Sequence, residues 1–316
     1  MSNINNQDEK EMVALFADFR GFSHMFDVLP AQKVYKFTNR YYQTASDIIE
    51  RYKGTFDNIV GDGFIAIWGK DTTHTKAPYY AVRSALEMRM ALLRQNIQYK
   101  WEAHFPLEIG VGVAMGKALH CIVGPKRHPI DTAIGKPVIL ASRLGDIAKN
   151  NQIYVDEKVA HAVTKWGKIQ KLPKTNIRGF KGTFPLYKVE GLMDFYLKNG
   201  ERRNSTFTRF VAPEIVAMVL KESGIRKPAL LRNLSASGAG IELVQKDDTP
   251  IEKDAEITLD LRRFDFPSFR SLDGRIVRVN TISEESTEER MLSRVGIEFH
   301  DLDPAKRRYL EKFNIA

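Results

Sequence analysis

The chain has 316 residues, of which 43% are hydrophobic and 28% are charged, and its formal net charge is +9. This length exceeds one comfortable core and predicts two domains, with a composition ordinary for a soluble globular protein. No apolar run approaches the roughly 20 residues of a membrane-spanning helix, and the polar N-terminus lacks the apolar core of a signal peptide. Because Cys121 is the only cysteine, no internal disulfide can form, which fits a reducing cytoplasm.

The positive charge invites a nucleic-acid or membrane-surface interpretation. Basic residues are spread among acidic ones, however, and the sequence has no long block of Lys and Arg. We therefore favour a solvated basic surface with pockets for anionic nucleotides. The motif set of nucleic-acid-binding proteins is absent, so we expect no nucleic-acid partner.

A disordered leader is predicted for residues 1–10, and the first strand follows it. Residues 13–17 are all apolar, and Asp18 comes directly after them. A short unbroken apolar run fits a strand buried on both faces, although a run of this length does not exclude a buried helix. A carboxylate where such a strand surfaces is costly unless it is solvated, paired or bound to a metal.

A second lone carboxylate lies in the segment 58–68. This segment reads as a strand, a tight Gly61-Asp62-Gly63 turn and another strand, which places Asp62 at a hairpin tip. Two acidic strand ends suggest a divalent-cation site with oxygen ligands, such as Mg²⁺ with a phosphate substrate. The alternative is that both carboxylates are merely solvated.

The rest of the first domain alternates helices and strands. Apolar spacing predicts helices at 30–52, from Pro78 to about Gln95, and at 138–149. Strands are expected at 107–118, at its neighbour 119–124, at 153–155 and at 186–189. The order βαββαβ predicts an α+β fold with a ferredoxin-like sheet and helices on one face.

The composition changes at residues 192–206, which read as a polar, basic linker. Beyond it, from 207 to 316, short strands of period two are separated by turn residues, which favours a small antiparallel β-barrel. The expected strands are 215–220, 229–233, 240–243, 256–261, 274–279 and 295–299. A helix at 304–313 is predicted to close the chain.

The segment Phe16-Ala-Asp-Phe-Arg-Gly-Phe22, followed by Gly61-Asp62-Gly63, resembles the catalytic domain of class III adenylate and guanylate cyclases. The resemblance covers about residues 11–191. It implies that Asp18, Asp62 and Phe19 form a site for two Mg²⁺ or Mn²⁺ ions. It also implies a homodimer with composite sites and a nucleoside triphosphate as substrate.

The segment 130–143 aligns with the second signature of this family. The resemblance implies that Thr132 reads the base, that Arg143 stabilises the transition state and that Lys181 binds the triphosphate. Arg143 has a guanidinium fork that suits a transferring phosphoryl group. The bland alternatives are an exposed helix arginine for Arg143 and a turn lysine for Lys181.

Two positions depart from the family pattern. Asn58, four residues before Asp62, stands where adenylate cyclases carry Lys and guanylate cyclases carry Glu for base binding. Ile139, four residues before Arg143, stands where the family has a ribose-positioning Asn. Because one lost polar contact typically lowers turnover by ~10²–10³-fold, these departures predict a weakened site.

The second domain resembles PilZ domains, which commonly receive cyclic-di-GMP. The likeness covers about residues 200–316 and rests on the segment 232–241 and on the ending at 295–303. It implies a cyclic-di-GMP site formed by the residues Arg202, Arg203, Arg209, Asn233, Ser235 and Gly238. The usual Arg-x-x-x-Arg spacing is altered, because Arg203 and Arg209 are six residues apart. A barrel that binds no nucleotide is the alternative.

The sequence thus predicts a homodimeric cyclase that converts ATP to cyclic AMP and is regulated by cyclic-di-GMP. Two alternatives remain. In one, the first domain is a pseudo-cyclase that binds nucleotide without turnover. In the other, it is only a dimerisation scaffold for the PilZ domain, against which Asp18, Asp62 and Arg143 argue.

Overall fold

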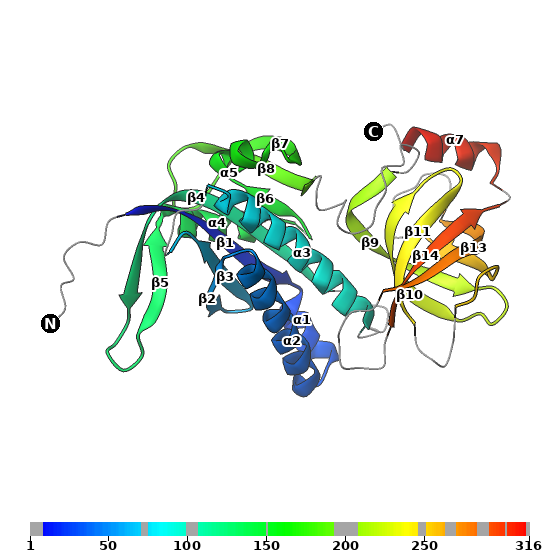
Figure 1. Ribbon diagram of the computed structural model, residues 1–316, viewed down its shortest axis with the longest axis horizontal. Helices are drawn as coiled ribbons and strands as arrows, with labels where there is room; N and C mark the ends of the chain where they lie inside the picture. Colours follow the sequence, from blue (N-terminus) through cyan, green and yellow to red (C-terminus); the bar gives the residue numbers. More distant parts are fainter. Residues whose placement is uncertain are drawn as a thin grey trace. The chain divides into compact units, whose positions relative to one another are not determined.

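The structure is a computed structural model that describes residues 9–70, 75–98, 107–149, 151–192, 208–245, 251–262, 270–282, 291–300 and 302–313. The chain divides into two compact units, Met1–Leu92 with Leu107–Glu201 and Leu93–Pro106 with Arg202–Ala316. The first unit contains an eight-stranded sheet and the second a closed barrel (Figure 1). Among the described residues, none of the helices combines the length and apolarity needed to cross a bilayer.

The sheet of the first unit has the strand order β2-β3-β1-β4-β6-β8-β7, and β5 pairs with β4. Strand β1 is antiparallel to both β3 and β4, which is the arrangement of the predicted ferredoxin-like fold. The predicted fold class is therefore confirmed. The elements are β1 (Lys10–Arg20), α1 (Phe22–Val28), α2 (Ala31–Arg51), β2 (Thr55–Val60), β3 (Gly63–Trp68), α3 (Ala77–Gln98), β4 (Glu108–Val123), β5 (Ile130–Gly135), α4 (Lys136–Ile147), β6 (Ile153–Val155), α5 (Glu157–Val163), β7 (Gly167–Asn176) and β8 (Thr183–Leu192).

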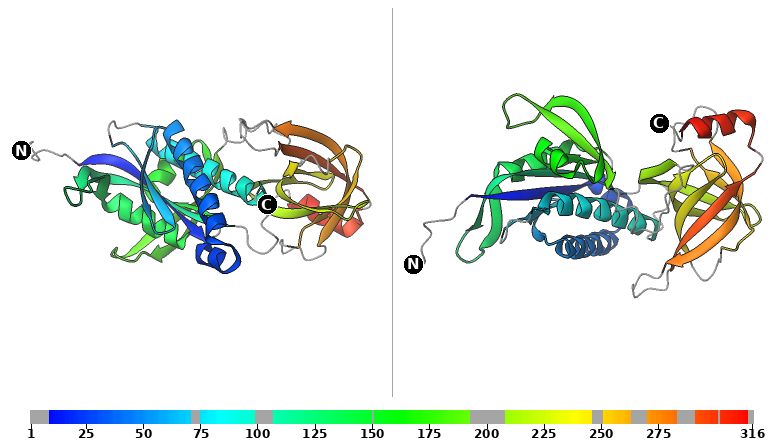
Figure 2. Two further views of the ribbon diagram at one scale, coloured as in Figure 1. Left: turned by 90° about the horizontal axis from the view of Figure 1, so that it is seen from below. Right: turned by 45° about the horizontal axis from the view of Figure 1, so that its top comes forward.

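Strand β1 runs through the middle of the sheet and is buried on both faces, which explains its unbroken apolar run. On one face, Phe16 packs in a cluster that includes Leu144 of α4. On the other face, the ring of Phe19 lies 5.1 Å from that of Tyr41 in α2, measured between centroids. Helix α3 lies beside α2, and α4 covers the opposite face (Figures 1 and 2). Helices therefore cover both faces, not one as predicted.

The prediction of neighbouring strands at 107–118 and 119–124 is wrong, because both segments belong to the single strand β4. The chain reverses only after Val123, where Gly124 adopts a positive φ of 100°, and β5 then pairs back along β4. Helices α1 and α5 and strands β5 and β7 were not predicted. The predicted leader and linker fall largely on residues 1–8 and 193–207, outside the described part. Lys10 and Leu192, at their edges, are instead the ends of β1 and β8.

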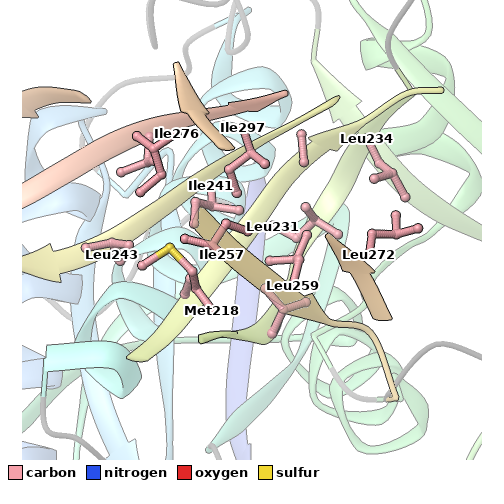
Figure 3. Close-up of a cluster of buried hydrophobic side chains, with 14 of the residues drawn as sticks. Met218, Leu231, Leu234, Ile241, Leu243, Ile257, Leu259, Leu272, Ile276 and Ile297 are labelled. Carbon is pink, nitrogen blue, oxygen red and sulfur yellow. The ribbon is translucent and has the colours of Figure 1, made fainter. Parts of the chain in front are cut away.

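The second unit contains a closed antiparallel barrel with the strand order β10-β11-β14-β13-β12-β9, as predicted. Closure leaves no unpaired edge strand. Alternate aliphatic side chains such as Leu231, Ile241 and Leu259 point inward and form the barrel core (Figure 3). The elements are β9 (Thr208–Leu220), β10 (Arg226–Leu234), β11 (Gly238–Gln245), β12 (Glu256–Asp260), β13 (Ser271–Ile282), β14 (Met291–Phe299) and α7 (Pro304–Phe313).

Glu242 of β11 is fully buried beside this core, with 0% of its surface exposed. The Nε atom of Arg294 donates to Glu242 Oε1 over 3.0 Å, and Arg232 Nε lies 3.8 Å from the same oxygen. Burial by itself would raise the pKa of Glu242, but the surrounding guanidinium groups, foremost that of Arg232, lower it. The buried charge is therefore compensated within the barrel unit.

Candidate active site

The structure brings Asp18 and Asp62 together at one end of the sheet. Asp18 lies near the end of β1, and its backbone pairs with Gly63, the residue directly after Asp62. The two carboxyl groups interact, because the negative charge of Asp62 and a hydrogen bond between the two side chains both raise the pKa of Asp18. The two carboxylates predicted from separate motifs thus form one acidic pair.

Two glycines allow this pair to form. Gly61 has a positive φ of 64°, which lets the chain reverse between β2 and β3. A Cβ atom on Gly63 would lie 2.7 Å from the carbonyl oxygen of Ala17 and 3.1 Å from Asp18 Oδ1. Only glycine therefore leaves room for the backbone to pass this close to the Asp18 carboxylate.

Negative charge is concentrated at this point. Burial, and next the charge of Asp62, raise the pKa of Asp18 to about 6, although Arg20 acts in the opposite direction. Burial, followed by the charges of Asp62 and Asp18, raises the pKa of the nearby Tyr42 hydroxyl to about 12. A divalent cation would relieve this repulsion, and carboxylate oxygens are ligands that Mg²⁺ and Mn²⁺ prefer. The donor set therefore fits such an ion.

The remaining ligands would have to come from other sources. Among the described residues, no cluster of three or more His, Cys, Asp and Glu side chains is present that could hold a metal. The side chain of Phe19 is buried and its ring stacks on Phe22 with centroids 5.7 Å apart. Phe19 can therefore offer only its backbone carbonyl oxygen, and water or substrate phosphate would complete the coordination.

Arg20 is a member of the site that the sequence reasoning missed. Its Nη1 atom lies 2.5 Å from Asp18 Oδ2, and its Nη2 atom donates to the carbonyl oxygens of Gly145 and, over 3.0 Å, Ala148. Arg20 thereby connects the acidic pair to the C-terminal end of α4. Its spacing of two from Asp18 was the available signal, because residues i and i+2 of a strand share a face.

Thr132, the predicted base-reading residue, belongs to a separate group of side chains. It lies on β5, and its hydroxyl donates to Asp57 Oδ2 of β2 over 2.6 Å. Asn58, which directly follows Asp57 in the sequence, is exposed. In the described part of the chain, no hydrogen bond or ion pair connects the Thr132 group with Asp18 or Asp62. One chain therefore carries the acidic pair and the Thr132 group as two separate clusters.

The predicted phosphate-binding residues lie on the surface. Arg143 projects from α4 with 38% of its side chain exposed, and its Nη1 atom donates to Asp146 Oδ2 over 3.0 Å. Ile139, one turn earlier on α4, is 52% exposed. Lys181 is exposed in the turn between β7 and β8. These side chains are accessible to a ligand from solvent or from a second subunit.

The barrel signature residues lie around the turn between β10 and β11. Asn233 pairs through its backbone with Arg209 of β9. Ser235 is buried, and its hydroxyl oxygen accepts hydrogen bonds from the amides of Ser237 and Gly238 over 3.2 and 3.1 Å. A Cβ atom on Gly238 would lie 2.1 Å from the carbonyl oxygen of Ile297, so the position requires glycine. The predicted ligands Arg202 and Arg203 lie outside the described residues.

Comparison with known protein families identifies both units of the chain. The family model for the adenylate and guanylate cyclase catalytic domain matches residues 4–191, and the PilZ domain model matches residues 201–315. The chain therefore belongs to the class III nucleotidyl cyclase family and carries a PilZ domain after its cyclase domain.

Curated relatives share the cyclase part. An uncharacterized protein of Mycobacterium tuberculosis is 25% identical over 160 residues, which are 50% of this chain and 28% of that protein. Adenylate cyclase 1 of Rhizobium meliloti is 23% identical over 186 residues, or 58% of this chain and 28% of the relative. The match thus spans less than a third of either relative's length.

Solved structures agree with the fold of the first unit. The adenylyl cyclase CyaB from P. aeruginosa is 26% identical, with a TM-score of 0.55 over 57% of this chain and 94% of that chain. A guanylyl cyclase structure is 25% identical, with a TM-score of 0.56 over 59% of this chain and 94% of that chain. Similarity therefore extends to cyclases named for either nucleotide.

Proposed function

We propose that this protein cyclises a nucleoside triphosphate, with ATP favoured, to the cyclic 3′,5′-monophosphate and pyrophosphate. The observation that carries the proposal is the acidic pair of Asp18 and Asp62, which the β1–β3 register holds at one end of the sheet. Relatives named adenylate cyclase support the choice of ATP. Asp18 and Asp62, with the Phe19 carbonyl, would hold two Mg²⁺ or Mn²⁺ ions.

In this reaction the 3′-hydroxyl oxygen attacks the α-phosphorus and gives up its proton to water, and the bond from that phosphorus to the bridging oxygen of pyrophosphate breaks. The cations, when bound, neutralise charge on the attacking oxygen and on the triphosphate. Arg143 would donate hydrogen bonds to the oxygens of the transferring phosphoryl group, because its planar guanidinium group matches their geometry. Lys181 would hold the outer phosphates, and Thr132 would contact the base.

A composite site in a homodimer accounts for the separation of the two clusters. Exposed aliphatic side chains lie on β5 and α4, which carry Thr132 and Arg143, and on β4, which pairs with β5. Ile122 of β4 is 71% exposed and Ile134 of β5 is 53% exposed, besides Ile139 of α4. Such side chains favour burial against another surface, and we propose a second copy of this chain.

A second candidate is a pseudo-cyclase that binds nucleotide and signals by conformation. Ile139 favours it, because an exposed isoleucine beside Arg143 neither donates nor accepts a hydrogen bond to ribose. Asn58 favours it as well, since an amide lacks the charge and reach of lysine. We rank this candidate below the enzyme because the acidic pair, Thr132 and Arg143 are all retained.

The PilZ domain suggests regulation by cyclic-di-GMP. Asn233 and Arg209 are backbone neighbours on β10 and β9, which supports a shared binding site at this end of the strands. Arg202 and Arg203 precede the barrel in sequence and would complete the site. Guanidinium groups suit this ligand, because they stack on guanine and form two hydrogen bonds with its N7 and O6 edge.

Turnover assays of the full chain with ATP and GTP, each with Mg²⁺ and with Mn²⁺, test the proposal. We expect cyclic AMP as the main product and no product from the Asp62→Asn variant. A folded, nucleotide-binding protein that forms neither cyclic nucleotide would establish the pseudo-cyclase instead. Analytical ultracentrifugation in the same buffers tests the homodimer.

A further inference from the structure

Beneath Thr132 lies a buried charged network that the cyclase motifs do not account for. Lys70, the second residue after β3, is 4% exposed, and its Nζ atom lies 2.5 Å from Asp57 Oδ1. The other oxygen of Asp57, Oδ2, accepts the hydrogen bond from the Thr132 hydroxyl over 2.6 Å. Thr132 is thus the outermost member of a chain of contacts that begins at a buried ammonium group.

A β-bulge explains why Asp57 points inward. Phe56 pairs with Ala66 and Asn58 with Ile65, so Asp57 is an extra residue on β2 without a partner on β3. Its side chain is only 1% exposed, whereas its neighbour Asn58 is exposed. The bulge therefore directs a carboxylate, not the base-binding residue of the family pattern, towards β5.

Lys70 also contacts β5 directly. Its Nζ atom donates to the carbonyl oxygen of Asp131 over 3.0 Å and lies 3.7 Å from Asp131 Oδ1. The same carboxylate oxygen lies 2.5 Å from His120 Nε2 of β4. A buried ammonium group is stable only when it is paired and hydrogen-bonded, and these contacts meet that requirement. Lys70 therefore fixes the positions of both Asp57 and the β5 backbone at Thr132.

This network determines the hydrogen-bonding character of Thr132. A carboxylate paired with an ammonium group has only acceptor sites, so it takes the single proton of the Thr132 hydroxyl. The hydroxyl then presents only lone pairs to a ligand. Adenine carries a donor, the 6-amino group, where guanine carries the acceptor O6. An acceptor at this position is complementary to adenine and repels guanine.

We propose that Asp57 and Lys70 are positioning residues that select adenine by fixing Thr132 as a hydrogen-bond acceptor. The proposal rests on the proposed function in one respect, since it takes Thr132 to contact the base. It assigns the preference for ATP to residues outside the family signatures. It also gives a role to a lysine that, with its side chain 4% exposed and already bonded, cannot itself reach the base.

The Asp57→Asn variant of the full chain tests this inference. Lys70 would hold the introduced carbonyl oxygen, so the introduced NH₂ group would donate to Thr132 and free its proton for guanine O6. We expect the ratio of kcat/KM for ATP to that for GTP to fall about tenfold or more. Thr132→Ser keeps the hydroxyl and should keep the ratio, whereas Thr132→Val should lower it.

A binding measurement separates this inference from the proposed catalytic activity. Calorimetry with the α,β-methylene analogues of ATP and GTP in Mn²⁺ gives the same selectivity as a ratio of Kd values without turnover. An unchanged ratio in Asp57→Asn would overturn the inference even if cyclic AMP is formed. A changed ratio without any turnover would support the inference and overturn the proposed activity. A wild type that binds neither analogue would overturn both.

Folding is controlled with a matched variant. Asp156→Asn makes the same change at another partly buried carboxylate of the same unit, and we expect it to leave the ATP-to-GTP ratio unchanged. Where Asp57→Asn alone lowers the yield of folded protein, the double variant Asp57→Asn with Lys70→Gln removes the ammonium group that has lost its closest carboxylate. The ratio in that variant must also fall, and a wild-type ratio would contradict the inference.

Discussion

Arg20 and Asp18 share one face of β1, and the Arg20 Nη1 atom lies 2.5 Å from Asp18 Oδ2. The guanidinium group is already committed on its other side to the carbonyl oxygens of Gly145 and Ala148. The single side chain of Arg20 therefore orients the Asp18 carboxylate and caps the C-terminal end of α4. We therefore expect the stability of the domain and its affinity for a cation to be coupled at this position.

We predict that Arg20→Met lowers both the stability of the cyclase domain and its affinity for Mn²⁺. The substitution leaves the partly buried carbonyl oxygen of Ala148 without the Arg20 donors, which costs about 1–3 kcal/mol when no water replaces them. It also removes the group that orients Asp18. Urea unfolding gives the stability change, and calorimetry with Mn²⁺ gives the affinity.

Arg143→Met is the matched control for stability. Its guanidinium group pairs with Asp146 in the same unit, but both side chains are well exposed, at 38% and 43%. Such pairs contribute about 0–1 kcal/mol. Equal losses of stability in the two variants would contradict the structural role assigned to Arg20.

We predict that Ile139→Asn combined with Asn58→Lys raises turnover by about tenfold or more. The first change restores a ribose-positioning amide and the second a base-binding charge. Ile139 is 52% exposed and Asn58 is also exposed, so neither substitution disturbs the core. Initial rates of product formation at saturating ATP measure the effect.

The stability of the double variant should equal that of the wild type, because both side chains lie on the surface. Ile139→Gln provides the comparison, since it adds polarity with a longer side chain that misplaces the amide. A double variant that remains folded and dimeric yet is no faster would show that Ile139 and Asn58 do not limit turnover.

We predict that Asp156→Asn changes how the stability of the cyclase domain depends on pH. Burial raises the pKa of Asp156 to about 6, against its hydrogen bonds from the amides of Val159 and Met115. Because the folded state binds this proton more tightly than the unfolded state, the group stabilises the fold below about pH 4. That contribution is lost as the pH rises through about 6.

The measurement is the free energy of unfolding of both proteins at pH 4.5 and pH 7.5. The difference should shift in favour of Asp156→Asn with rising pH, by about 2 kcal/mol between these two pH values out of about 3 kcal/mol for the full pKa difference of about two units. The amide loses one acceptor oxygen at every pH, so that loss cancels in the comparison. A difference that is constant with pH would show that Asp156 does not titrate in this range.

We predict that cyclic-di-GMP binds the full chain and that Arg203→Ala or Arg209→Ala weakens binding at least tenfold. Each substitution would remove a pair of hydrogen bonds between the arginine and guanine, and such a pair is worth about 1–3 kcal/mol. Arg275→Ala is the control, because Arg275 is an exposed barrel arginine that pairs with Glu298 over 3.5 Å. Calorimetry measures the Kd, and the absence of both heat and a thermal shift at high ligand concentration would refute the site.

Strands were predictable from the sequence where both faces of the strand are buried, or where buried and exposed side chains alternate strictly. The apolar run in β1 and the inward aliphatic positions of the barrel gave correct strands. The prediction failed at β4, which continues past Ala118 because its partner β5 extends the pairing to Val123. Sequence periodicity does not show how far a strand continues when no turn residue interrupts it.

The sequence motifs predicted the acidic pair but not the basic side chains of Arg20 and Lys70, which contact carboxylates inside the first unit. Asp18 and Asp62 stand in recognisable motifs at a strand end and a hairpin tip. Lys70 carries no such signal, because its partner Asp57 faces it only through the bulge in β2. Long-range ion pairs of this kind depend on tertiary packing, which local patterns do not encode.

The hydroxyl of Ser235 is already used by the protein itself, since it holds the amides of Ser237 and Gly238 in the turn between β10 and β11. Gly238 is likewise required by the close passage of the Ile297 carbonyl. A PilZ domain that no longer bound a nucleotide would still need both residues to close its barrel. Ser235 and Gly238, two of the three signature positions, are thus diagnostic of the PilZ fold. Only Asn233 and the arginines can indicate whether the domain binds its ligand.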